Sequence, residues 1–129
     1  MTPELTVLAL AALLQVIQIG LAGAGISRDA GLDWNMGPRD RQPQFSDQTR
    51  RLQRAVNNHF ESLAFLTIAV LLLTVSGKAG GWTALAAWLH LGARVLYVPA
   101  YAYGWTPWRS YIWGVGFAAV IAMILRALF

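Results

Sequence analysis

Residues 62–75 read SLAFLTIAVLLLTV, an apolar run, and the residues directly before it, RRLQRAVNNHFE (50–61), are strongly polar. A helix rising 1.5 Å per residue needs about twenty residues to cross the hydrocarbon core of a bilayer. The apolar run 62–75 is shorter than that. The span reaches the required length only if the helix begins inside the polar stretch, at about residue 54, so that it covers residues 54–75. This junction predicts a membrane-spanning helix whose first turns carry charged side chains.

The composition supports a membrane protein. The 129 residues are 57% hydrophobic and 12% charged, which is far from an ordinary water-soluble domain. Long apolar runs without strand-like alternation favour helices over a membrane barrel. We predict an all-α integral membrane protein with one domain over residues 1–129. Its four transmembrane helices should form an up-down bundle because short turns make neighbouring spans antiparallel. The predicted spans are 5–26, 54–75, 82–104 and 108–128.

The distribution of cationic residues predicts the orientation. Arginines crowd the polar loop 27–50, the start of the following span and the turn after the third span: Arg28, Arg39, Arg41, Arg50, Arg51, Arg54 and Arg109. The other side of the membrane would carry only Lys78 and Arg126. The positive-inside rule therefore places the loop in the cytoplasm and both termini on the non-cytoplasmic side.

Several function classes are disfavoured. Cysteine is absent, which excludes disulfides, thiolate metal sites and cysteine nucleophiles. His59 and His90 belong to no ligand pair of the HxxxH kind, so we expect no metal site. A nucleic-acid partner is not expected, because the chain lacks a broad basic face with interleaved aromatics on a soluble fold.

Polar side chains form a stripe on each of two predicted spans. At 100° per residue, the second-span members fall within a sector of about 80°: Arg51, Arg54, Asn58 and Glu61. The third-span members also share one sector, and Arg109 follows after the next turn: His90, Arg94, Tyr97 and Tyr101. Ionised groups at membrane depth must face protein or a wet cavity, so the stripes predict a polar site between helices.

The stripes offer groups suited to a small zwitterion. Guanidinium forks bind carboxylates, a carboxylate binds an ammonium group, and an amide and two phenols complete the set. A peptide-like thiol such as glutathione has that pattern of groups. Other interpretations remain open. Arg28, Arg39, Arg41 and Arg50 could only fix orientation or contact lipid phosphates, and Arg51 fits either role. An ion pair between Glu61 and Arg94 could simply hold helices together.

Three segments together resemble the MAPEG family, the membrane-associated proteins of eicosanoid and glutathione metabolism, particularly its short bacterial members. They are RAVNNHFE (54–61), ARVLYVPAYAYG (93–104) and TPWRSYIW (106–113). GPRD (37–40) is also similar to the bacterial branch. The resemblance implies a homotrimer, placed in the bacterial inner membrane, with glutathione as cosubstrate bound between neighbouring subunits near the cytoplasmic face.

The resemblance also implies residue roles. Glutathione would be bound by the side chains that match the family motifs: Arg54, Asn58, Glu61, Arg94, Tyr97 and Tyr101, with Arg51 at a further basic position. Arg109 matches the arginine proposed to stabilise the thiolate, and Tyr101 is our second candidate for a catalytic residue. Arg28 is the nearest match to a first-loop arginine that some members use. Ser62 departs from the aromatic residue that several members carry there.

The sequence thus predicts a glutathione-dependent membrane transferase or peroxidase acting on lipophilic electrophiles. Its partners would be other copies of itself, membrane lipids and a lipophilic small-molecule substrate. One alternative is a non-catalytic lipid or small-molecule binding membrane protein of the same fold, since fold membership does not secure activity. A second is a structural or interaction protein whose polar stripes only stabilise a trimer.

Overall fold

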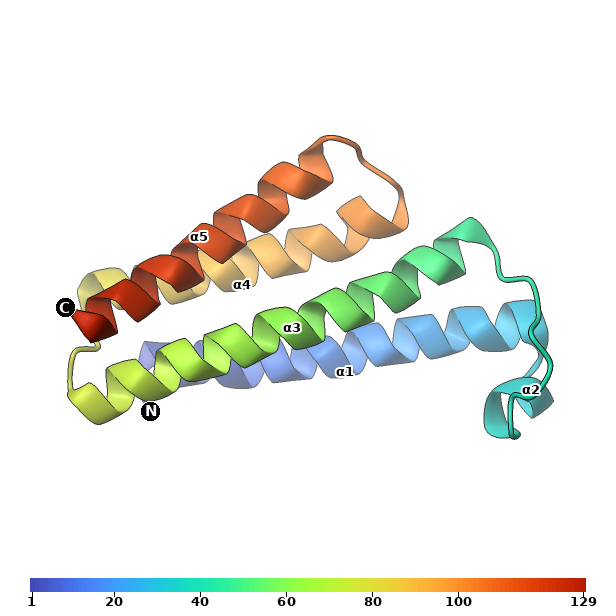
Figure 1. The fold of residues 1–129 in the computed structure, drawn as a ribbon, viewed down its shortest axis with the longest axis horizontal. Coiled ribbons are helices and arrows are strands. Elements are labelled where there is room, and N and C mark those ends of the chain that lie inside the picture. The colour runs from blue at the N-terminus through green and yellow to red at the C-terminus, as the bar shows by residue number, and fades with distance from the viewer.

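A computed structural model describes all 129 residues and is built of helices and connecting loops. Four long helices lie lengthwise beside one another, and a short helix caps one end (Figure 1). The helices are α1 (Pro3–Ala30), α2 (Leu32–Met36), α3 (Asp47–Ser76), α4 (Gly81–Ala102) and α5 (Trp108–Leu128). The predicted all-α class is confirmed. The structure has five helices because the polar loop 27–50 contains α2.

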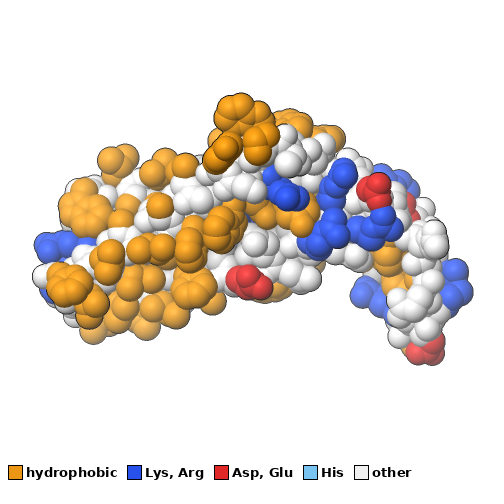
Figure 2. Space-filling view, turned by 45° about the horizontal axis from the view of Figure 1, so that its top comes forward, with side chains coloured by type: hydrophobic (Ala, Val, Ile, Leu, Met, Phe, Trp, Pro, Cys, Tyr) orange, Lys and Arg blue, Asp and Glu red, His pale blue; other side chains and the backbone are white.

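Three helices are long and apolar enough to cross a membrane, namely α1, α3 and α5. Helix α4 has 22 residues, and its polar members include His90 and Arg94. These apolar helices support an integral membrane protein, whereas the fourth span and the trimer stay predictions. Hydrophobic side chains cover most of the length of the face shown in Figure 2, and most of the basic side chains on this face gather toward the end that carries α2.

Both chain termini lie at the end of the molecule opposite to α2 (Figure 1). This arrangement follows from the antiparallel order of the four long helices. It agrees with the expectation that the two termini share one side of the membrane. Which side is cytoplasmic stays a prediction.

The start of α3 is fixed by a side-chain cap. The Ser46 hydroxyl accepts a hydrogen bond from the Thr49 backbone N–H at 3.3 Å, which satisfies one of the free donors of the first turn. The helix ends at Gly77, whose φ of 68° lies in the left-handed region that glycine tolerates. Helix α3 therefore continues without interruption from its arginine-rich first turns into its apolar part.

Two glycines allow close helix contacts. A Cβ added at Gly25 of α1 would lie 2.7 Å from Thr49 Oγ1 of α3. A Cβ added at Gly116 of α5 would lie 3.2 Å from the Cβ of Ala93 on α4. Small residues let helix backbones approach closely, which is a common way of packing membrane helices.

The apolar core lies in the half of the molecule nearer the termini. Its most buried members come from all four long helices: Val7, Ala11, Leu66, Ala69, Val70, Leu73, Ala87, Val120 and Met123. Toward the α2 end, α5 diverges from α3 in Figure 1. The tightly packed half thus holds the helices together, and the other half leaves room for a polar site between them.

Candidate functional site

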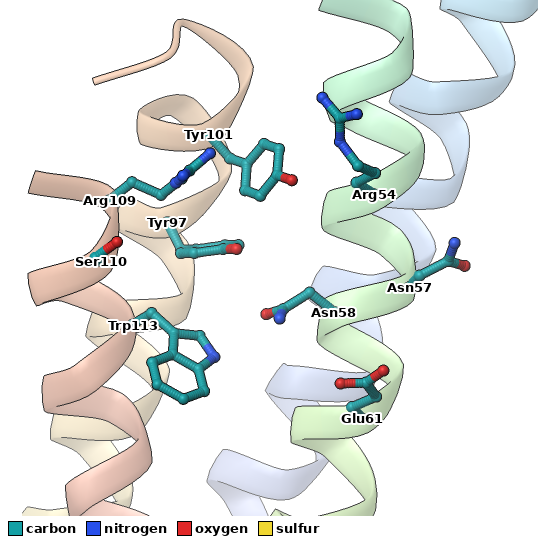
Figure 3. Close-up of a pocket in the computed structure, with 9 residues that line it drawn as sticks. All are labelled: Arg54, Asn57, Asn58, Glu61, Tyr97, Tyr101, Arg109, Ser110 and Trp113. Atoms are coloured by element: carbon teal, nitrogen blue, oxygen red, sulfur yellow. The ribbon is translucent and has the colours of Figure 1, made fainter. Parts of the chain in front are cut away.

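A cleft with a volume of about 380 Å³ opens between α3, α4 and α5. Such a volume falls in the range of roughly 300–1,000 Å³ typical of small-molecule sites. Figure 3 shows its lining: Arg54, Asn57, Asn58, Glu61, Tyr97, Tyr101, Arg109, Ser110 and Trp113. The structure therefore brings six of the predicted site residues together and adds Asn57, Ser110 and Trp113.

Helix α3 supplies one wall of the cleft. Arg54, Asn58 and Glu61 follow a spacing of four and three residues, which keeps them on one helix face. In Figure 3, Asn58 extends toward α5, whereas Asn57 points to the other side of α3. The uninterrupted course of α3 is what carries this polar face from the arginine-rich turns down to the apolar part.

Tyr101 lies between two guanidinium groups from different helices. Arg109 Cζ is 4.8 Å from the centroid of the Tyr101 ring, and Arg54 Cζ is 5.8 Å from it. Both distances fall within the roughly 6 Å range of cation–π attraction. Tyr97 packs edge-on against Tyr101 with ring centroids 5.4 Å apart. The two tyrosines thus position both cations at the same cleft.

Arg94 lies beside the cleft and not in its lining. Only 2% of the residue is exposed. Its Nε donates to His59 Nδ1 at 3.2 Å and its Nη1 donates to Asn58 Oδ1 at 2.7 Å. Its Cζ lies 4.4 Å from the Tyr97 ring centroid. The alternative of an ion pair with Glu61 is not found, because Arg94 takes neutral partners instead. Arg94 therefore orients two residues that do line the cleft.

His59 explains how Arg94 is held. Its Nε2 lies 2.8 Å from the carbonyl oxygen of Ala11 on α1. A carbonyl oxygen only accepts, so Nε2 carries the proton and Nδ1 is free to accept from Arg94. This fully buried histidine links α1 to α3 and α4. The sequence did not reveal this role, since nothing in it shows that Ala11 packs against His59.

A second, inner cavity of about 50 Å³ adjoins the cleft and shares Asn58, Glu61 and Trp113 with it. Its other lining residues are Ser62, Phe65, His90, Arg94 and Phe117. His90 Nδ1 lies 2.8 Å from the carbonyl oxygen of Gly116 and donates to it. The Ser62 hydroxyl therefore donates to His90 Nε2, at 3.1 Å.

Besides Arg94, two of the predicted basic residues lie outside the cleft. Arg51 contacts Gly104, where an added Cβ would lie 3.2 Å from Arg51 Cζ. Arg28 pairs with Asp29 at 3.1 Å and also donates to Thr49 Oγ1. Arg28 thus ties the end of α1 to the start of α3 in this chain. The prediction that Arg51 binds ligand has no support from the cleft geometry.

The charges in the cleft favour an anion that also carries an ammonium group. Arg54 and Arg109 supply two positive charges and Glu61 one negative charge, which leaves one positive charge in excess. Neither arginine takes part in an ion pair within the chain. Their guanidinium groups therefore remain free for carboxylates or a thiolate.

The sequence model of the MAPEG family matches residues 4–129, which is essentially the whole chain. No curated protein and no solved structure gives a significant match. The resemblance carried by the motifs around Arg54, Arg94 and Arg109 is therefore confirmed at the level of the family. The chain belongs to the MAPEG family.

Proposed function

We propose that the protein is a glutathione-dependent membrane transferase or peroxidase that acts on lipophilic electrophiles. The observation that carries the proposal is the convergence of Arg54, Glu61 and Arg109 on one cleft from two helices. Membership of the MAPEG family favours a function related to glutathione. The cleft offers a guanidinium group for one of the two carboxylates of that tripeptide, a carboxylate for its ammonium group and a second guanidinium group for its thiolate.

The proposed binding mode assigns protein groups to three parts of glutathione, namely one of its two carboxylates, its ammonium group and its thiol. Arg54 binds a carboxylate, with Asn58 donating or accepting a further hydrogen bond. Glu61 binds the ammonium group, since it is the one carboxylate of the cleft. Arg109, at the other side of Tyr101, is left to face the thiol.

Arg109 would activate the thiol by electrostatics. A free cysteine thiol has a pKa of about 8.5 and is mostly protonated at neutral pH. A nearby guanidinium favours the thiolate and lowers that pKa. The Tyr101 hydroxyl can donate a hydrogen bond to the thiolate sulfur. An electrophile that enters from the bilayer beside Trp113 then meets the nucleophile already oriented, and proximity supplies much of the acceleration.

We infer that α4 also crosses the membrane and that three chains form a homotrimer. Glu61 and Arg54 are exposed on the isolated chain. Facing lipid would cost a charged side chain at least a few kcal/mol. A neighbouring subunit beside α3 would shield these groups and close the open side of the cleft. The arginine-rich end would then face the cytoplasm, with both termini outside it.

The test is turnover by the detergent-purified protein with glutathione and chlorodinitrobenzene. The wild type should form the conjugate. Arg109→Ala should lower kcat by roughly tenfold or more, while glutathione binding changes less, because a thiolate partner is lost. Arg126→Ala is the matched control, since Arg126 is exposed near the end of the same helix. A saturable lipophilic ligand without turnover would favour the non-catalytic alternative instead.

A further inference from the structure

A groove of about 420 Å³ lies between the last turns of α1, the first turns of α3 and the last turns of α4. It shares no lining residue with the cleft or with the inner cavity. Its volume falls in the range of roughly 300–1,000 Å³ typical of small-molecule sites. The proposed function leaves this groove unused, although it lies at the arginine-rich end of the molecule.

The lining of the groove changes from polar to apolar along all three helices, and it changes in the same direction on each. The polar lining residues nearer the α2 end are Arg28, Gln48 and Tyr103. The apolar ones, one to two turns deeper along the same helices, are Leu21, Leu52 and Val98. This gradient fits an elongated amphipathic ligand whose polar group lies at the membrane surface.

The groove is open along the outside of the chain. Leu21 is 45% exposed and Tyr103 is 64% exposed, and Ala24 between α1 and the other walls is also exposed. Helices α1 and α3 are long and apolar enough to cross a membrane. An acyl chain of the surrounding bilayer can therefore enter the deeper part of the groove from the side.

The polar end of the groove carries one positive charge in excess. Arg28 pairs with Asp29, and this pair is neutral as a whole. Arg51 has no ion pair within the chain. It lies beside the groove, because its guanidinium contacts Gly104, the residue that follows Tyr103. The surplus charge of Arg51 matches the single negative charge of a phosphodiester.

Arg28 is held in a fixed orientation with one nitrogen to spare. Its Nε donates to Asp29 Oδ1 at 3.1 Å, and its Nη2 donates to Thr49 Oγ1 at 3.2 Å. Its Nη1 makes no hydrogen bond within the chain, and 58% of the side chain is exposed. An arginine that neighbouring groups already orient loses less conformational entropy when it binds a phosphate.

We propose that this groove binds one anionic phospholipid. Arg28 Nη1 donates to the phosphate, Arg51 supplies the surplus charge beside it, and an acyl chain lies along the apolar part between α1 and α4. A free phosphate would use only the polar end, whereas the greater part of the groove is apolar. The inference goes beyond the proposed function and does not need glutathione to bind.

The charge of the headgroup provides the first test. Native mass spectrometry of the detergent-purified protein compares phosphatidylglycerol with phosphatidylcholine of the same acyl chains. The wild type should bind phosphatidylglycerol about fivefold more tightly, and Arg51→Gln should remove this preference. Arg126→Gln is the matched control, since Arg126 is exposed at the other end of the molecule. Inorganic phosphate should not displace the lipid. Equal affinity of the wild type for the two lipids would overturn the proposal.

The shape of the groove provides the second test. Ala24→Phe places a ring in the groove on an exposed position of α1, and it should weaken phosphatidylglycerol binding about tenfold. Ala12→Phe makes the same change on another exposed position of α1 and should leave the affinity unaltered. Unchanged binding by a folded Ala24→Phe protein would show that the lipid does not occupy this groove.

A third measurement needs no variant. Crystals of the wild-type protein grown with phosphatidylglycerol that carries brominated acyl chains should show anomalous peaks between Leu52 and Val98. Peaks found only elsewhere on the surface, or no peaks at saturating lipid, would overturn the proposal. None of the three measurements uses glutathione. The proposed function can therefore fail while the lipid site holds, and the lipid site can fail while the proposed function holds.

Discussion

Arg109 and Tyr101 form a cation–π pair across the turn between α4 and α5, with the guanidinium carbon 4.8 Å from the ring centroid. Arg54 approaches the same ring from α3, at 5.8 Å. One aromatic ring therefore positions the cation proposed to bind a carboxylate and the cation proposed to bind the thiolate. Substitutions at Tyr101 can therefore test the role of its ring separately from the role of its hydroxyl group.

Tyr101→Phe should leave the KM for glutathione near that of the wild type and lower kcat by about tenfold. The ring still holds both arginines, whereas the hydrogen bond to the thiolate is lost, and such bonds to charged groups are worth roughly 1.5–3 kcal/mol. Tyr101→Leu removes the ring and should raise KM as well. Steady-state kinetics of the two variants check this. If Tyr101→Phe and Tyr101→Leu change kcat and KM to the same extent, the ring and the hydroxyl group of Tyr101 do not have separate roles.

Arg109→Ala should shift the pH dependence of conjugation. The guanidinium stabilises the anionic thiolate and so lowers the pKa of the bound thiol. Without it the pKa rises, and the activity of the variant should reach its plateau at higher pH than that of the wild type. The ultraviolet absorbance of the thiolate, recorded against pH with bound glutathione, measures the pKa directly. Coincident titration curves for the two proteins would remove Arg109 from thiol activation.

Glu61→Gln should weaken glutathione binding about tenfold, because the ammonium group loses its charged partner. A glutathione analogue without the amine should bind the wild type and the variant with equal affinity. The affinities of the two ligands for the two proteins form a double-mutant-type cycle that isolates the interaction between Glu61 and the amine. Calorimetric titration provides the affinities. Asp40→Asn is the control for charge alone, since Asp40 lies in the exposed loop. If the analogue loses the same affinity as glutathione, Glu61 does not bind the amine.

Gly116→Ala should lower the melting temperature. The added Cβ would lie 3.2 Å from the Cβ of Ala93 and 3.5 Å from His90 Nδ1, and such overpacking typically costs 1–3 kcal/mol. Gly114→Ala is the matched control on the same helix, because no atom lies within 4 Å of its added Cβ. That variant should keep or slightly raise the melting temperature through helix propensity. Equal melting temperatures for the two variants would show that α5 does not approach α4 closely at Gly116.

His59→Leu should destabilise the protein by roughly 3 kcal/mol, because it leaves Arg94 Nε buried without an acceptor. Replacing both residues with leucine should cost less than the sum of the two single changes, since the uncompensated charge is then gone. Thermal unfolding in detergent measures all three variants. Strict additivity would contradict the direct coupling between His59 and Arg94.

The apolar runs and the helical spacing of polar residues were enough to predict the helices and most of the cleft. Arg54, Asn58 and Glu61 share one face by spacing alone, and Arg109 follows directly after the turn. Angular position, however, does not give depth within the structure. Arg94 shares a sector with Tyr97 and Tyr101, yet it lies under the cleft wall because Asn58 and His59 bind its guanidinium.

Features that depend on tertiary contacts could not be read from the sequence. Helix α2 is short, and Asn35 within it donates to the carbonyl oxygen of Gly23 on α1, a contact that no local pattern indicates. Trp113 lines the cleft because α5 turns that face toward α3 and α4, which its position in the sequence does not indicate. The two histidines acquire roles only through carbonyl groups of other helices, those of Ala11 and Gly116.

The most direct test of the central claim, that the cleft binds glutathione, is the melting temperature of the detergent-purified protein at increasing glutathione concentration. A ligand that binds only the folded state stabilises it in proportion to the logarithm of concentration once the site is saturated. The wild type and Arg41→Ala should show this rise, and Arg54→Ala should need about tenfold more glutathione to match it. A wild-type melting temperature that does not change with glutathione would contradict the account.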